Sequence, residues 1–155
     1  LVLSTLHTND APSAIARLVD MGAQPFLVES TLIAVLAQRL VRTICDACHE
    51  TYRPNATQLI PLGLTEADLE GKKLHRGAGC TKCRSTGYYG RQAIFEIMPV
   101  SSAIRNLIHH NAGSQEIQAQ AIKEGMNTLQ QSGIRKMLEG ITTVEEVIRV
   151  TGRLA

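Results

Sequence analysis

The sequence predicts an α/β protein that carries an inserted metal-binding lobe and ends in a helical subdomain. Three observations lead to this prediction. Within residues 1–22, a strand-like apolar run is followed by a polar turn and a helical pattern; two Cys-x-x-Cys pairs lie further along; and capped helical segments follow residue 100. We therefore expect an α/β segment at residues 1–44, a metal lobe at residues 45–90, and a return strand with helices at residues 91–155.

The first unit of this fold is read from residues 1–22. Residues 1–6 have the length and apolar character of a core strand. Asp10 is a good N-cap, Pro12 is tolerated in the first helical turn, and Gly22 stands where a left-handed residue ends a helix. Ligands of α/β domains bind at the carboxyl ends of strands, which makes the turn at residues 7–10 a candidate site.

The amino-acid composition changes in the middle of the chain. Residues 26–37 are predicted to form a largely buried helix, and residues 40–44 a strand that leads to the first cysteine. Between residues 45 and 90, proline and glycine become frequent, with one short helical candidate at residues 65–69. This segment is the expected lobe.

The last third is expected to be mainly helical. Residues 93–97 have strand character and are followed by Pro99. Four short helices then follow, which we expect to pack as one bundle. Their predicted starting residues are Ser101, Ser114, Thr128 and Thr143, the last within a Thr-x-x-Glu capping box.

Composition excludes several partners. The chain has 155 residues, with 16 Lys+Arg against 14 Asp+Glu, and no tryptophan, so neither charge nor stacking favours nucleic acid. The longest apolar stretch near the middle, residues 32–37, is too short to span a bilayer. Free thiols in a metal motif favour a cytoplasmic location. Because the strand-like pattern begins at residue 1, we expect the chain to be the later part of a longer polypeptide.

The two cysteine pairs carry the strongest chemical signal. Cys45/Cys48 and Cys80/Cys83 contain all four cysteines of the chain. Two such turns supply four thiolates in a tetrahedron, the arrangement of closed structural zinc sites. Lys82 and Arg84 flank Cys83 and would offset the negative charge. A closed site of this kind predicts a structural role and leaves no open position for catalysis.

Two other interpretations of the cysteines stay open at this point. Disulfides are possible in principle, although four cysteines in 155 residues without a recognisable secretory signal do not favour them. Residues 45–49 also spell the Cys-x-x-Cys-His of covalent haem attachment, which leaves Cys80 and Cys83 without a role. Zinc explains all four.

The chain contains no phosphate-binding loop, dinucleotide fingerprint or nucleophile elbow, so it holds no complete catalytic machinery. His7 is the best candidate for a functional histidine, because an imidazole at a strand end can donate to a phosphate oxygen. A histidine with purely structural hydrogen bonds explains its position equally well.

Several motifs together resemble one family. Residues 3–11, Leu-Ser-Thr-Leu-His-Thr-Asn-Asp-Ala, resemble the histidine box of the ATPases of type II secretion and type IV pilus assembly. The resemblance continues, in the family's order, through Ala-Gln-Arg-Leu-Val-Arg at residues 37–42, the cysteine pairs, Gly-Tyr-Tyr-Gly-Arg at residues 87–91, and Thr-Val-Glu-Glu-Val at residues 143–147. It covers essentially the whole chain.

The resemblance implies the end of a RecA-like ATPase core, a tetracysteine zinc lobe and a helical C-terminal subdomain. It implies a homo-hexamer at the cytoplasmic face of the inner membrane that uses ATP and Mg²⁺ to drive pseudopilus assembly, with inner-membrane platform and cytoplasmic-domain proteins as partners. His7 would sense the γ-phosphate, and Arg17 and Arg91 would act on the phosphates or form interface salt bridges.

The family's phosphate-binding loop and acidic magnesium-site residues are absent here, so we expect this chain alone to be inactive. The secretion branch is favoured by residues 26–42, and a pilus assembly ATPase is the runner-up. The alternative of another class is a freestanding zinc-ribbon module that binds protein or nucleic acid. A third hypothesis, compatible with the ATPase, is that the lobe docks on a membrane platform protein.

Overall fold

The chain is described here by a computed structural model that covers residues 1–152. It forms a mixed α/β structure with two small sheets and two compact units. The first unit contains Leu1–Gln38 and Phe95–Thr128, and the second contains Arg39–Ile94 and the described residues from Leu129 onward. Each unit is thus built from two separate stretches of chain. The segment limits expected at residues 44 and 90 stay a prediction.

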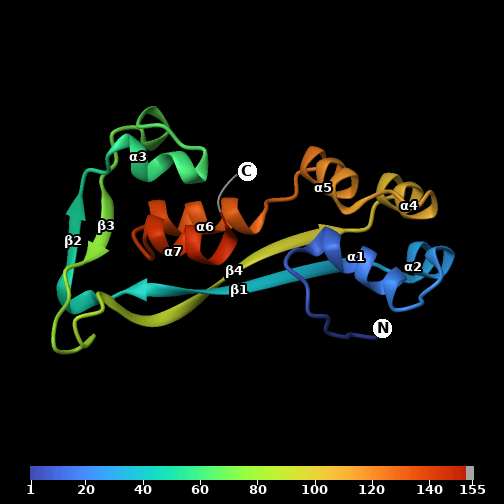
Figure 1. The fold of residues 1–155 in the computed structure, drawn as a ribbon, viewed down its shortest axis with the longest axis horizontal. Helices are drawn as coiled ribbons and strands as arrows, with labels where there is room; N and C mark the ends of the chain where they lie inside the picture. Colours follow the sequence, from blue (N-terminus) through green and yellow to red (C-terminus); the bar gives the residue numbers. More distant parts are fainter. Residues whose placement is uncertain (153–155) are drawn as a thin grey trace. The chain divides into compact units, whose positions relative to one another are not determined.

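One two-stranded sheet pairs β1 (Ala34–Ile44) with β4 (Tyr88–Pro99), and their arrows point in opposite directions in Figure 1. The other sheet pairs β2 (His49–Tyr52) with β3 (Leu74–Gly77) in antiparallel register, with His49 opposite Gly77. The expected strands at residues 40–44 and 93–97 are confirmed as parts of β1 and β4.

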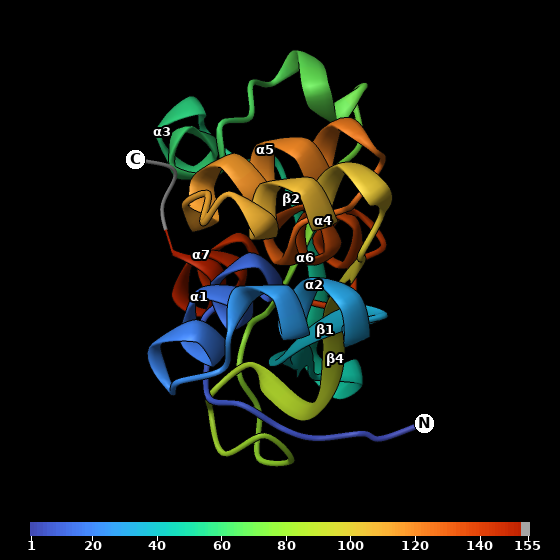
Figure 2. The same cartoon turned by 90° about the vertical axis from the view of Figure 1, so that its right-hand side faces the viewer.

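The first unit consists of four helices packed with the adjoining segments of β1 and β4. They are α1 (Ala11–Asp20), α2 (Pro25–Thr31), α4 (Ser102–His109) and α5 (Ser114–Lys123). Helix α1 packs on α2 and α5, and α4 packs on the same two helices, as Figure 2 shows from their side. Their shared core includes Ile15, Val28, Met98, Ile104 and Ile117.

The start of α1 is fixed by two carboxylates. Asp10 is the N-cap, as predicted, and its Oδ1 accepts the Ser13 N–H at 2.8 Å. Glu96 is buried, and its Oε1 accepts the Ala11 N–H at 2.7 Å. A carboxylate at a helix N-terminus is stabilised by the partial positive charge of the free N–H groups. Gly22 has φ +96°, the left-handed value expected of it.

Two predictions in the first unit are wrong. Residues 1–6 form no strand and are largely exposed, with Leu3 at 87% exposure. A strand needs a hydrogen-bonding neighbour, and the described residues place none beside this segment. Residues 26–37 are not one helix, because α2 ends at Thr31 and β1 begins at Ala34. The apolar run could not distinguish helix from strand, and pairing with β4 decides the outcome.

The second unit joins the cysteine segment to the last two helices. The segment contains η1 (Asp46–Cys48), α3 (Ala56–Leu59), η2 (Ile60–Leu62) and η3 (Ala67–Leu69), the last within the short helix predicted at residues 65–69. Helices α6 (Leu129–Leu138) and α7 (Val144–Thr151) pack on each other. The core of this unit is formed by Leu59, Leu62, Leu69, Leu74, Met137, Val144 and Val147. The lobe therefore shares one apolar core with the last two helices.

The four C-terminal helices occur near the predicted positions. Ser101 and Thr143 are N-caps that accept the N–H groups of residues 104 and 146, respectively. Ser114 is instead the first residue of α5, with Gly113 as the N-cap. Helices α4 and α5 belong to the first unit and α6 and α7 to the second, so the helices are divided between units instead of forming the expected single bundle.

Candidate metal centre

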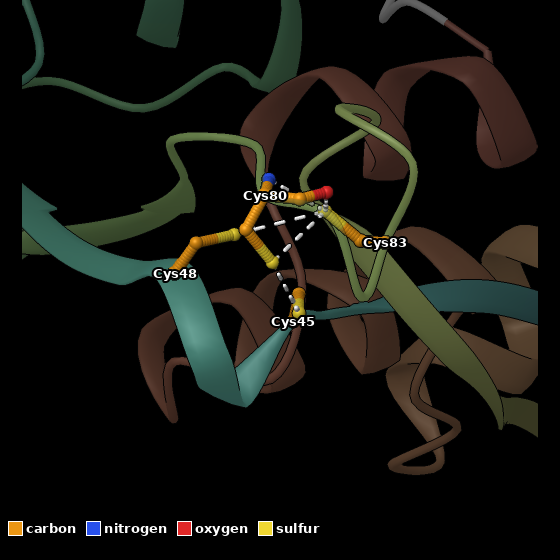
Figure 3. Close-up of side chains that lie close together, drawn as sticks. All are labelled: Cys45, Cys48, Cys80 and Cys83. Carbon is orange, nitrogen blue, oxygen red and sulfur yellow. Dashed lines mark hydrogen bonds between the residues drawn. The ribbon is translucent and has the colours of Figure 1, made fainter.

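The four cysteine sulfurs converge on one point (Figure 3). Cys45 follows β1, Cys48 ends η1, and Cys80 and Cys83 lie in the turn after β3. All four sulfurs lie within 4.8 Å of one another. The separations are 3.9 Å for Cys45–Cys80, 3.8 Å for Cys48–Cys83 and 3.7 Å for Cys80–Cys83.

These separations fit a tetrahedral metal site. Zinc–thiolate bonds of about 2.3 Å in a tetrahedron place the sulfurs about 3.8 Å apart. Disulfide sulfurs are about 2.05 Å apart, and all four cysteines are free. The four thiols form a single group, in which Cys80 and Cys83 contribute as much as the first pair. The site can therefore hold one metal ion such as zinc.

Backbone N–H groups donate to two of the sulfurs. Gly79 N–H donates to the Cys48 sulfur at 3.3 Å, while Cys80 and Gly87 N–H groups donate to the Cys83 sulfur at 3.2 and 3.3 Å. Burial alone would raise the pKa of Cys83, but these donors lower it to about 6, whereas burial raises the pKa of Cys48 to about 12. The site thus favours one thiolate even before a metal binds.

Two glycines allow the chain to close around the sulfurs. Gly87 has φ +78°, and a Cβ there would lie 2.5 Å from the Gly77 carbonyl oxygen. The Cys45 N–H donates to the Gly87 carbonyl at 2.9 Å, and the Ala78 N–H donates to the Cys48 carbonyl at 2.9 Å. The two cysteine turns are therefore joined by main-chain hydrogen bonds that require close backbone approach.

The charged neighbours of the cysteines lie at the rim. Lys82 donates to both oxygens of Asp46, at 2.6 and 2.9 Å. These hydrogen bonds, which Lys82 donates and Asp46 accepts, lower the pKa of Asp46 and raise the pKa of Lys82. Lys82 therefore ties the first cysteine turn to the second. Arg84 is exposed and has φ +52°.

The other candidate residues lie outside this cluster. His7 is exposed in the N-terminal segment before α1, and Arg17 is exposed on α1. Both belong to the first unit, while Arg91 is exposed on β4 in the second. Their expected roles with a nucleotide stay predictions.

Sequence reasoning missed a buried ion cluster in the second unit. Glu146 is fully buried and accepts the Arg42 backbone N–H at 2.9 Å and its guanidinium at 2.9 and 2.7 Å. It also accepts two hydrogen bonds from Arg149, at 2.8 and 2.6 Å. The Thr143–Glu146 spacing predicted a capping box, but Arg42 is 104 residues away in sequence, so no local pattern reveals this partner.

Comparison with known proteins gives the family. The family model described as "Type II/IV secretion system protein" matches residues 1–149. This chain belongs to the type II/IV secretion system protein family.

Similar members of the family are known from several bacteria. A type II secretion system protein E of Pseudomonas aeruginosa is 49% identical over 97% of this chain and 30% of its own length. A type IV pilus assembly ATPase of Thermus thermophilus is 47% identical over 97% of this chain and 17% of its own length. A type II secretion system protein E of Dickeya dadantii is 45% identical over 97% of this chain and 29% of its own length.

The chain thus spans less than a third of the length of these family members. Among the described residues, no helix has the length and apolar character needed to cross a membrane.

Proposed function

We propose that this chain is the C-terminal portion of a cytoplasmic ATPase that drives pseudopilus assembly in type II secretion. The supporting observation is the alignment of nearly the whole chain, in one piece, with relatives named as secretion proteins and pilus assembly ATPases. In this proposal the complete protein is a homo-hexamer associated peripherally with the inner membrane. Its partners are inner-membrane platform and cytoplasmic-domain proteins of the secretion machinery, and nucleic acid is not among them.

The nucleotide chemistry belongs to the complete protein. We propose that residues 1–44 end a RecA-like core, in which His7 senses the γ-phosphate and Arg17 and Arg91 act on phosphate charge. A phosphate-binding loop and magnesium ligands are not found in this chain, so the chain alone should not hydrolyse ATP.

A phosphate-release assay tests whether the complete protein hydrolyses ATP and the chain alone does not. We expect the product of the complete gene to release phosphate from Mg-ATP and the 155-residue chain to release none. His7→Gln in the complete product should lower the rate roughly tenfold, whereas His110→Gln, an exposed histidine at the end of α4, should not. ATP hydrolysis by the chain alone would refute the prediction that this chain is inactive. A complete product that never hydrolyses ATP would refute the proposal that the complete protein is an ATPase.

Deletion of the gene distinguishes the two branches. Loss of secreted proteins from the medium with pili intact supports type II secretion. Loss of pili with secretion intact assigns the chain to the runner-up, a type IV pilus assembly ATPase.

We further propose that the cysteine cluster holds a structural zinc ion. Four protein thiolates fill a tetrahedral zinc, so the ion would stabilise the fold and bind no substrate. The sulfur separations near 3.8 Å support this assignment.

Metal analysis under reducing conditions tests it. The purified chain should contain one zinc, and a strong chelator should lower the melting temperature of the lobe. Cys48→Ser should lose the metal, while His49→Gln, the exposed neighbour, should keep it. Absence of zinc from the wild-type chain, or melting that a chelator leaves unchanged, would disprove the assignment.

A further inference from the structure

A surface hollow of about 440 Å³ in the second unit is lined by Leu40, Arg42, Arg91 and Arg149. Three of these four residues carry a guanidinium, and none carries a carboxylate. Ligand sites commonly have volumes of about 300–1,000 Å³. The hollow therefore combines adequate space with a concentration of positive charge on a chain whose formal net charge is only +2.

Two of the arginines, Arg42 and Arg149, are positioned by hydrogen bonds to one buried carboxylate. The carboxylate of Glu146 is fully buried and accepts hydrogen bonds from Nε and one terminal nitrogen of Arg42. It accepts hydrogen bonds from the same two kinds of nitrogen of Arg149. The Arg42 guanidinium also stacks on the Tyr88 ring, 4.1 Å from its centroid. A guanidinium has five N–H donors, so each still has donors to offer. The side chain of Arg42 is 43% exposed and that of Arg149 is 57% exposed.

Arg91 completes the hollow from β4. It is exposed and stands on a paired strand, which fixes the position of its backbone. One buried carboxylate offsets one of the three positive charges, which leaves an excess of about two at the hollow. Preorganised arginines with free donors are the groups that bind phosphate oxygens in forked pairs.

We propose that this hollow binds a multiply charged phosphate-bearing anion. The shared chemistry is a phosphate dianion or a diphosphate, which can come from a nucleotide, from inorganic phosphate or from a phospholipid headgroup. Glu146 is a positioning residue for the two arginines, and Arg91 contacts the anion directly. The hollow shares Arg91 with the nucleotide role proposed above, but pyrophosphate binding by the 155-residue chain is measured without ATP hydrolysis, so the two proposals can fail separately.

Calorimetric titration of the 155-residue chain with inorganic pyrophosphate tests the proposal. We expect saturable binding that weakens with added salt. Arg91→Gln should weaken it at least roughly tenfold, as expected for charge-assisted hydrogen bonds. Arg53→Gln makes the same change of charge at an exposed arginine of the same unit that does not line the hollow, and should alter affinity less than about twofold.

Two further probes identify the source of the phosphate. Tighter binding of magnesium-free ATP than of pyrophosphate assigns the site to a nucleotide. Arg91-dependent binding to phosphatidylglycerol vesicles, but not to phosphatidylcholine vesicles, assigns it to a lipid surface. Pyrophosphate bound as tightly as either assigns it to inorganic phosphate.

The proposal is overturned if no phosphate-bearing probe binds the wild-type chain, or if Arg91→Gln and Arg53→Gln weaken binding equally. Nitrogen-15 spectra of the wild-type chain guard against a misfolded variant. Pyrophosphate should shift the arginine Nε–H signals of Arg42, Arg91 and Arg149, and unchanged signals would also overturn the proposal.

Discussion

Neutralising the buried carboxylate of Glu146 should destabilise the second unit by about 3 kcal/mol at neutral pH. Burial alone would raise the pKa of Glu146, but hydrogen bonds from Arg149 and Arg42 lower it from 4.5 to about 2. A lowering of this size corresponds to about 3 kcal/mol of stability. In the Glu146→Gln variant the amide oxygen can still accept, but the charge that the two guanidiniums require is lost.

The sign of the pH dependence follows from the direction of the pKa change. The folded state lowers the pKa of Glu146, so this contribution is complete above pH 4.5, the ordinary pKa of the group. It is lost progressively as pH falls toward 2. The difference in stability between the wild type and Glu146→Gln should therefore be largest at neutral pH and shrink over this acidic range.

Tyrosine fluorescence is a suitable probe for this experiment. All three tyrosines, Tyr52, Tyr88 and Tyr89, lie in the second unit, and the chain has no tryptophan. Urea unfolding followed by this signal reports on that unit. Acid also protonates thiolates and releases bound metal, but this effect is common to both proteins and cancels in their difference.

Glu145→Gln is the matched control, because this substitution makes the same change of charge at the neighbouring residue, which is exposed. Its unfolding free energy should change by less than about 0.5 kcal/mol. The reasoning is refuted if both variants lose the same stability, or if the loss in Glu146→Gln is unchanged between pH 7 and pH 2.

Three further predictions concern backbone and caps. Gly71→Ala should cost about 1–2 kcal/mol of stability, because Gly71 has a positive φ. Gly87→Ala should cost clearly more, because Gly87 also has a positive φ and its new Cβ would meet the Gly77 carbonyl. Equal losses in urea unfolding would contradict this close approach. Asp10→Ala should cost about 1 kcal/mol through loss of the α1 N-cap, measured by thermal melting followed by circular dichroism. Thr143→Val should cost about 1–2 kcal/mol in the tyrosine-monitored assay, because the hydroxyl caps α7 and bonds a tyrosine hydroxyl at 2.7 Å.

The metal cluster could be predicted from sequence because its signal is local. Two residues between cysteines place both sulfurs on one turn, and only the distance between the two turns had to come from the fold. The caps at Asp10, Ser101 and Thr143 were predictable for the same reason, since each acts within three residues.

Features that depend on distant partners could not be predicted. Residues 1–6 look like a strand, but strand formation requires a neighbour, and no local pattern supplies it. Residues 34–37 continue an apolar run that also suits a helix, and their pairing with β4 makes them a strand. The role of Glu146 was hidden because its first partner, Arg42, is 104 residues away.

The stability of the lobe does not rest on the metal alone. Leu59, Leu62, Leu69 and Leu74 pack with residues of α6 and α7, so an apolar core holds one part of the lobe. Just before Cys45, the chain is attached to the connection between α6 and α7: the Ile44 N–H donates to the Ile141 carbonyl at 2.9 Å. The Thr142 hydroxyl donates to the Arg42 carbonyl at 2.8 Å. Residues 42–45 therefore contact the metal cluster, the carboxylate of Glu146 and the connection between α6 and α7 within one short segment.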